Sequence, residues 1–220
     1  MNNINQNHNK NFQYKIYRNS NKTKLKAIES DCNCTFSKAM SNRKSIREFT
    51  NQPILLDKLS FFLRFSAGIN TNRHDNSRYV PSAGAKYPIE IYMVELTGVC
   101  REKGIYHYNI KDDTIELIKK GDFRDLIYLY SHKQDCILTC TSVAIMSCVF
   151  ERNQEKYGER GYRYILLDAG HICQNMYLTS TFLNLGFVAI GGFNDNEINN
   201  LIGLDGINES ALYLGCLGTI

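Results

Sequence analysis

Residues 162–185, "YRYILLDAGHICQNMYLTSTFLNL", form the longest helical pattern of the chain and constrain its fold more than any other stretch. Apolar side chains occupy most of the helical circumference, and such a helix needs packing partners on several sides. Gly186 follows directly and predicts the C-terminal cap, because glycine accepts the left-handed backbone that ends many helices. We therefore expect one long helix in the middle of the domain.

Shorter helical and strand patterns fill the rest of the chain without the regular alternation that builds a parallel sheet, so the predicted class is α+β. The polar stretch 70–88 is a long loop, and loops of this length in compact domains usually bind something. We predict helices at 36–49, 56–67, 122–131 and after Asn194, a hairpin at 104–121, and strands at 89–96, 136–145, 187–193 and 209–218.

The charge is distributed unevenly along the 220 residues. The net charge is +4, yet residues 1–50 hold ten Lys and Arg against three Asp and Glu, so the remainder is slightly acidic. A dedicated nucleic-acid binder would carry its basic surface on the folded domain. We therefore exclude nucleic acid as the partner and interpret residues 1–35, rich in Asn and Lys, as a mobile or partner-dependent arm before a domain at 36–220.

The eight cysteines indicate free thiols rather than disulfides or a metal site. Most of them lie within apolar patterns, no C-x-x-C pair occurs, and "CNC" at 32–34 lacks a second ligand pair. The N-terminus has no apolar signal region, and no window holds 18 uninterrupted apolar residues. We expect a cytoplasmic protein without membrane insertion.

Three short motifs are candidates for ligand binding, each with a structural alternative. On the predicted helix, Arg43 and Arg47 of "RKSIR" share a face, and Ser45 lies near the same end. Two guanidiniums and a hydroxyl suit a phosphate, although a solvated helix face explains them as well. The small residues of "PSAGAKYP" at 81–88 suit a flat ligand or a tight turn. "AIGGF" at 189–193 offers consecutive backbone N–H groups or a simple glycine bulge.

Together these motifs, in this order, resemble the FMN-dependent nitroreductase-like family. "RYVPSAGAKYPIEIY", "KYGERGYRYILLDAGHICQNMYL", "AIGGF" and "LIGLDGINESALYLGCLG" look like its SagB-type dehydrogenase branch, the azoline oxidases of peptide-modification pathways. The resemblance covers about residues 40–218. It implies a central mixed or antiparallel sheet flanked by helices, and a homodimer whose interface contains the long central helix.

The resemblance also implies positions for FMN. Arg43 is expected at the phosphate, Ser45 at the phosphate or ribityl chain, and Arg47 at the pyrimidine side of the flavin. Gly191 and Gly192 are expected to present N–H groups to N5 and O4, where hydride arrives. The chain departs from many relatives in having no Lys or Arg after Arg163 to help hold the phosphate. The residues expected along the isoalloxazine ring are Pro81, Ser82, Ala83, Gly84 and, nearby, Lys86.

The catalytic base implied by the resemblance is Lys156, with Tyr157 as its neighbour. Oxidation of an azoline removes one ring proton and one hydride, so the protein must supply a base. We expect Lys156 to be partly buried and crowded by Arg152, Arg160 and Arg163, which favours the neutral amine. A surface lysine beside a packing tyrosine is the alternative interpretation.

The resulting functional hypothesis is an FMN-dependent dehydrogenase that converts thiazolines or oxazolines of a ribosomal precursor peptide to azoles, working with a cyclodehydratase. Two alternatives stay open. One is a general NAD(P)H-dependent nitroreductase or quinone reductase of the same fold, and the other is a flavin-binding scaffold within a synthetase complex.

Overall fold

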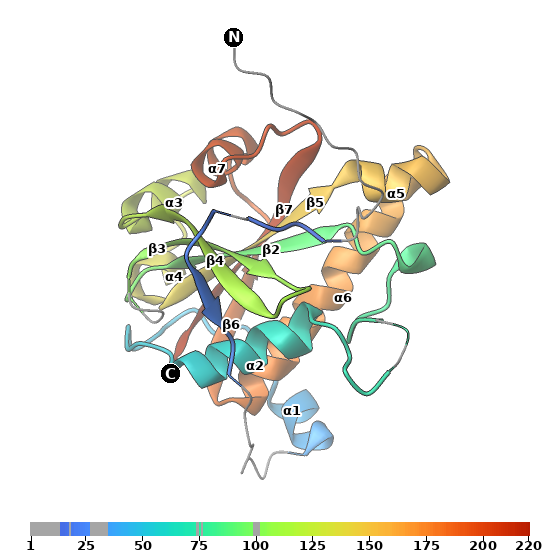
Figure 1. Ribbon diagram of the computed structural model, residues 1–220. Coiled ribbons are helices and arrows are strands. Elements are labelled where there is room, and N and C mark those ends of the chain that lie inside the picture. Colours follow the sequence, from blue (N-terminus) through green and yellow to red (C-terminus); the bar gives the residue numbers. More distant parts are fainter. Residues whose placement is uncertain (1–13, 18, 27–34, 74, 76, 99–101) are drawn as a thin grey trace.

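Seven strands form one antiparallel sheet in the part of the chain that the computed structural model describes, residues 14–17, 19–26, 35–73, 75, 77–98 and 102–220 (Figure 1). Their order is β1-β4-β3-β2-β5-β7-β6, and this confirms the α+β class with a purely antiparallel sheet. The strands are β1 (Lys22–Lys24), β2 (Ile89–Glu95), β3 (Gly104–Asn109), β4 (Thr114–Lys120), β5 (Ser142–Val149), β6 (Leu185–Ile190) and β7 (Glu209–Thr219).

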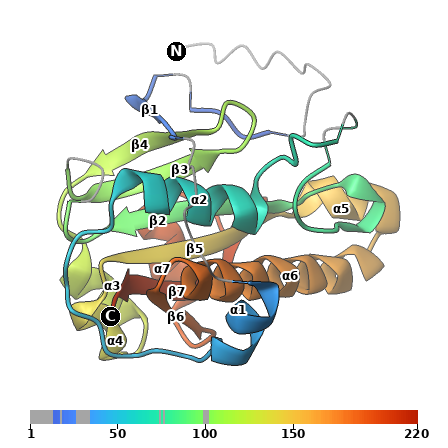
Figure 2. The same cartoon turned by 90° about the horizontal axis from the view of Figure 1, so that it is seen from below.

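Helices cover both faces of this sheet, and the sheet separates two hydrophobic cores. Alternate side chains of β2 and β5 enter each core, so β2 is buried along its whole length. One core packs against α2 and α6, which lie side by side (Figures 1 and 2), and the other against α3, α4 and α7. The helices are α1 (Phe36–Asn42), α2 (Leu56–Ala67), α3 (Arg124–Tyr130), α4 (Cys136–Thr139), α5 (Phe150–Tyr157), α6 (Arg160–Phe182) and α7 (Asp195–Ile202), with a 3-10 turn η1 (Ala83–Ala85).

The long central helix is confirmed as α6, which has 23 residues. It packs on α2, α5, β6 and β7, yet one stripe that includes Tyr162, Leu166 and Leu167 stays about half exposed in the single chain. The predicted cap at Gly186 is wrong. The helix ends at Phe182, and Gly186 lies in β6, where a Cβ atom would come within 2.9 Å of three side chains.

The helix predicted at 36–49 ends at Asn42, so Arg43 and Arg47 do not share a helical face. The chain continues in extended form, and the Ile46 N–H donates to the Phe187 carbonyl of the edge strand β6 at 3.0 Å. An edge strand offers unpaired backbone groups to a neighbouring segment, and this long-range pairing prevails over the local helical pattern.

Two further differences concern the segment from Cys136 to Tyr157. The strand predicted at 136–145 is divided into the short helix α4 and the start of β5. An apolar run alone does not distinguish a buried strand from a buried helical turn. α5 is not among the predicted elements, although it positions the candidate base described below.

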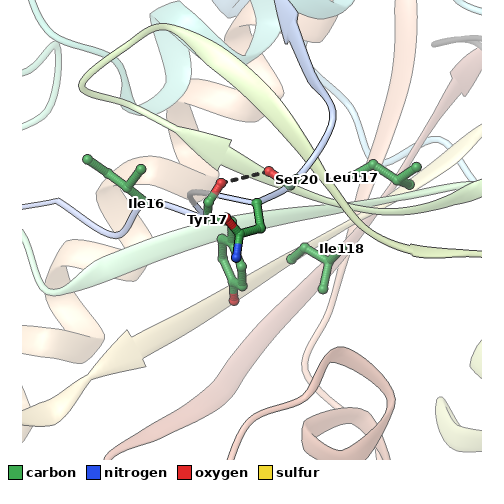
Figure 3. Close-up of a pocket in the computed structure, with 6 residues that line it drawn as sticks. Ile16, Tyr17, Ser20, Leu117 and Ile118 are labelled. Carbon is green, nitrogen blue, oxygen red and sulfur yellow. Dashed lines mark hydrogen bonds between the residues drawn. The ribbon is translucent and has the colours of Figure 1, made fainter. Parts of the chain in front are cut away.

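The described part of the predicted N-terminal arm lies against the sheet. β1 pairs with β4, the Tyr17 N–H donates to the Glu116 carboxylate at 2.7 Å, and Lys15 forms an ion pair with Glu209. A pocket of about 500 Å³ lies between this segment and β4. Figure 3 shows Tyr17 and Leu117 on its walls. A domain boundary at residue 35 stays a prediction.

The described cysteines agree with the expectation of free thiols. They are all buried and none is in a disulfide, while Cys32, Cys34 and Cys100 lie outside the described residues. Within the described part of the chain, no group of His, Cys, Asp or Glu is arranged to hold a metal ion, and no helix is long and apolar enough to span a membrane.

A row of buried ionisable side chains crosses the sheet from α5 to β4. Arg152 donates to the Glu90 carboxylate and, at 3.1 Å, to the Tyr87 carbonyl. His107 Nε2 lies 2.8 Å from Glu90, and its Nδ1 lies 3.3 Å from Glu116. Burial opposes the charged forms, but the ion pairs outweigh it, lowering the pKa of Glu90 to about 2 and raising the pKa of His107. The row joins three strands to α5.

We predict that Glu90→Gln lowers the free energy of unfolding by about 3 kcal/mol at pH 7, because Arg152 and His107 lose a buried carboxylate partner. The folded pKa of Glu90 lies below its ordinary value of 4.5, so its contribution is present above that value and lost as the pH falls toward 2. Urea denaturation at pH 7 and pH 4 measures this.

The exposed Glu151→Gln is the control, with an expected change within about 0.5 kcal/mol. An equal loss for both variants at pH 7 contradicts the prediction.

Candidate active site

Residues 81–88 form a tight loop before β2, and its backbone is strained. Gly84, Ala85 and Tyr87 have φ angles of 60°, 52° and 46°, in the left-handed region. For a residue other than glycine this conformation costs about 1 kcal/mol or more, and such strain gathers at functional sites. The small residues expected to approach a flat ligand therefore lie in a loop whose shape the rest of the protein enforces.

α5 brings the predicted base to this loop. A Cβ atom at Gly84 would lie 2.5 Å from the Tyr157 hydroxyl and 2.9 Å from Lys156 Nζ, so both side chains meet the turn at a position that only glycine leaves free. The Tyr157 ring packs edge-on against Tyr164 of α6, with centroids 4.9 Å apart. Lys86 lies 3.4 Å from Glu155 of α5. The structure thus brings together residues that are about 70 positions apart in the sequence.

α6 closes the other side of the loop. The Ser82 hydroxyl donates to the Asp168 carboxylate at 2.6 Å and accepts the Tyr87 N–H at 2.9 Å. A pocket of about 270 Å³ opens between the loop and this helix. Its lining residues are Pro81, Ser82, Ala83, Tyr164, Leu167, Asp168 and His171.

The expected surroundings of Lys156 are wrong for the single chain. Lys156 is exposed rather than partly buried, as are Arg160 and Arg163. Arg152 is buried, but it binds Glu90 and the Tyr87 carbonyl and therefore supports the loop instead of crowding the lysine.

A second group of predicted residues gathers around Tyr177 on α6. The Ser45 hydroxyl lies 3.0 Å from the Tyr177 hydroxyl, and the Arg43 guanidinium lies over the Tyr177 ring at 5.3 Å from its centroid. The Tyr177 hydroxyl also accepts the N–H of Ala189, which precedes the pair Gly191 and Gly192, at 2.9 Å. Although residues 43–47 are not helical, Tyr177 thus holds the side chains of Arg43 and Ser45 beside the end of β6.

The remaining predicted residues border this second group. Arg47 is exposed in an open depression of about 580 Å³, lined by residues 44–50 and Ile220. Gly191 and Gly192 are exposed beyond β6, and Cβ atoms there would meet their nearest neighbours only at 3.9 and 3.8 Å. The backbone at the glycine pair is therefore open to a ligand.

The two groups do not meet within one chain. Their anchors Asp168 and Tyr177 are nine residues apart on α6, which corresponds to about 14 Å along the helix axis. The loop group offers small residues, a lysine and a tyrosine, whereas the Tyr177 group offers cations, a hydroxyl and open backbone. Together these chemical groups suit an aromatic cofactor with a phosphate tail.

The sequence model described as "Nitroreductase family" matches residues 40–219. The chain belongs to the nitroreductase family. Among its relatives, the putative nitroreductase MJ1384 of Methanocaldococcus jannaschii is 38% identical over 160 residues, covering 73% of this chain and 80% of that protein.

Two other relatives are a trifolitoxin-processing protein and a microcin B17-processing protein. The trifolitoxin-processing protein TfxB of Rhizobium leguminosarum bv. trifolii is 32% identical, and the microcin B17-processing protein McbC of Escherichia coli is 26% identical. The matches cover 60% and 65% of this chain but only 37% and 54% of those proteins. This similarity agrees with the SagB-type branch.

Solved structures show the same fold. A chain of the E. coli microcin synthetase McbBCD complex with truncated pro-MccB17 matches with a TM-score of 0.70 at 22% identity, covering 88% of this chain and 75% of that chain. The NADPH:FMN oxidoreductase from Vibrio harveyi complexed with NAD+ matches with a TM-score of 0.59 at 16% identity, covering 84% and 68%. The nitroreductase-like architecture is therefore established.

Asp168 and Tyr177 are the site residues that sequence reasoning missed. Asp168 is the single acidic residue of α6, and a lone carboxylate in an otherwise apolar helical pattern is the signal that points to it. Tyr177 gives no comparable signal, because a tyrosine in such a pattern is ordinary packing.

We predict that Gly84→Ala displaces the Tyr157 hydroxyl and lowers the free energy of unfolding by more than the roughly 1 kcal/mol that a left-handed alanine costs. Gly203→Ala is the matched control, since Gly203 has φ of 79° and open space around it. Tyr157→Phe removes the nearer of the two atoms in conflict and is expected to recover part of the excess. A double-mutant cycle measures the coupling, and additive losses contradict the contact.

Proposed function

We propose that the protein is an FMN-dependent azoline dehydrogenase that oxidises thiazoline or oxazoline rings of a ribosomal precursor peptide. The observation that carries the proposal is the contact of Lys156 and Tyr157 with the turn at Gly84. It puts a candidate base beside the loop that is expected to line a flavin. The similarity to TfxB and McbC supports a peptide substrate.

The residues present fit FMN. The strained loop and the pocket beside Tyr164 offer an apolar surface for the isoalloxazine ring. Arg43 and Ser45, fixed by Tyr177, and the exposed Arg47 supply cations and a hydroxyl for the phosphate end. The open backbone at Gly191 and Gly192 leaves room for a ring edge. These are the residues that would hold the cofactor.

We infer that the chain works as a homodimer. Tyr162, Leu166 and Leu167 leave a stripe of α6 about half exposed, and Phe36 and Met40 of α1 are also exposed at 75% and 47%. Two copies packed along this face bury the stripe and bring the loop group of one copy toward the Tyr177 group of the other. This accounts for a helix that is apolar nearly all round and for two half-sites in one chain.

The bound flavin would supply a hydride acceptor for the β-carbon of the azoline ring. The chain's own residues supply the remaining functions. Lys156 Nζ takes the proton from the ring carbon that was the α-carbon, and Tyr157 orients the ring or shares that proton. Gly191 and Gly192 would offer backbone N–H groups to the cofactor, and Arg47 would place positive charge beside it.

Partners are proposed on the same basis. A fold match to a chain of the McbBCD synthetase complex supports a cyclodehydratase as the enzyme that makes the azoline.

A second candidate function, an NAD(P)H-dependent nitroreductase or quinone reductase, is favoured by the similarity to MJ1384 and to the Vibrio enzyme. In that case a nicotinamide rather than a peptide delivers the hydride, and Lys156 is dispensable. A flavin-binding scaffold without activity fits the lack of a basic residue after Arg163.

We predict that the protein binds FMN and that Arg43→Ala weakens binding at least about tenfold, because one charge-assisted hydrogen bond to phosphate is lost. Flavin fluorescence titration measures the affinity, with Lys120→Ala, on an exposed lysine of β4, as the control. Failure of the wild type to bind FMN overturns the cofactor assignment.

We predict that Lys156→Ala lowers azole formation at least about 100-fold, because the base is removed, while FMN affinity is unchanged. The assay follows the loss of two mass units per ring in a cyclised precursor peptide. Rapid reduction of the flavin by NADPH without peptide, with Lys156→Ala fully active, establishes the reductase instead.

A further inference from the structure

The shape of loop 81–88 requires support from outside the loop. Ala85 and Tyr87 hold left-handed φ angles of 52° and 46° without being glycine. Such conformations persist only where the surroundings over-determine them. Side chains of other elements must therefore provide that support.

Asp168 of α6 is the side chain that reaches into the loop. Its carboxylate accepts the Ser82 hydroxyl at 2.6 Å and also the Ala83 N–H, the first residue of η1. Ser82 itself makes no side-chain cap bond to this turn, so Asp168 caps it from another element. The Ser82 hydroxyl in turn accepts the Tyr87 N–H at 2.9 Å. Asp168 therefore fixes both ends of the strained stretch.

Two cationic side chains support the far end of the loop. Arg152 donates to the Tyr87 carbonyl at 3.1 Å, and the Arg78 guanidinium lies 4.6 Å from the centroid of the Tyr87 ring. The turn that contains Gly84, where Lys156 and Tyr157 make contact, is joined to α6 through Asp168, which accepts from Ser82 and Ala83.

The carboxylate is placed where ionisation is costly. Asp168 is 4% exposed, and burial raises its pKa despite the hydrogen bonds from Ser82 and Ala83. The titratable groups that act on it are His171 from its own helix, Arg78 just before the loop and Cys148 of β5. Because the folded pKa lies above the unfolded one, the stability that Asp168 contributes is present at low pH and lost as the pH rises through the folded pKa. A buried carboxyl group with a raised pKa is typical of functional sites rather than of optimised cores.

We propose that Asp168 is a positioning residue of the active site, whose carboxylate sets the conformation of loop 81–88 and so the place of the Gly84 turn against Lys156, Tyr157 and the cofactor. It does not touch the reacting atoms. The part of this inference that concerns the cofactor rests on the proposed function, whereas the part that concerns the loop does not.

Asp168→Asn tests the inference, because it keeps the shape of the side chain and removes the charge. The loop readout is hydrogen exchange of the peptide that contains residues 82–87, followed by mass spectrometry on protein without flavin. We expect exchange at least about tenfold faster in this peptide, with a melting temperature at pH 7 equal to or above that of the wild type. The stabilisation relative to the wild type is expected to shrink at pH 4, where Asp168 is closer to neutral.

The cofactor readout is the dissociation constant for FMN, which we expect to rise at least about fivefold in Asp168→Asn. Ser82→Ala is the second variant, and its effect on exchange is not expected to add to that of Asp168→Asn, since both break the same link. Glu151→Gln, an exposed carboxylate of α5, is the matched control and leaves exchange and affinity unchanged.

The possible outcomes distinguish the positioning role of Asp168 from the proposed function. Unchanged exchange in 82–87 for both variants overturns the positioning role, even if FMN binds the wild type. A melting temperature that falls by several degrees, with faster exchange throughout the protein, assigns Asp168 an ordinary structural role and also overturns it. If the wild type does not bind FMN, the proposed function fails while the exchange data still decide the role of Asp168.

Discussion

Both halves of the candidate site are held by side chains of one rigid helix, α6. Asp168 fixes the loop that carries the Gly84 turn, and Tyr177 fixes Arg43, Ser45 and the end of β6. α6 packs on α2, α5 and the sheet, so its axis cannot shift without disturbing a close-packed core. The separation of the two anchors is therefore set by helix geometry, and a cofactor that uses both halves must match it.

The row of buried ionisable side chains holds loop 81–88 from the side opposite α6. Arg152 joins Glu90 in the sheet to the Tyr87 carbonyl at the end of the loop. Removing two charges from water is costly, and the cost is offset here only because every partner is close and fixed. The loop is thus held between an ionic network in the sheet and a carboxylate on α6, and this allows its backbone to keep conformations that an isolated peptide would leave.

The exposed stripe on α6 relates this half of the site to the proposed homodimer. Lys156 is exposed in the single chain, and so are Leu166 and Leu167 on the neighbouring helix. In the proposed homodimer, a second copy covering the stripe would change the surroundings of the lysine from water to protein, and burial favours the neutral form of a lysine. Catalysis by Lys156 and dimer formation are therefore linked in the proposed function.

The sequence by itself determined the α+β class, α2, the hairpin β3–β4, the central helix and the three ligand motifs, because these depend on local periodicity, turn chemistry and short-range spacing. The family also followed from the motifs, whereas the roles of the site residues stay predictions. Local patterns were not sufficient at 36–49, where pairing with β6 replaces a helix, or at 136–145, where an apolar run is compatible with either element.

Only the tertiary structure decided which side chains meet. The contact of Lys156 and Tyr157 with Gly84, the support of Ser82 by Asp168, and the use of Arg152 within the sheet all join residues more than 60 positions apart. Such contacts depend on how the helices lie on the sheet, which no local pattern encodes. The chain's motifs therefore specified the chemistry available to it, and the packing of α5 and α6 against the loop decided where that chemistry is assembled.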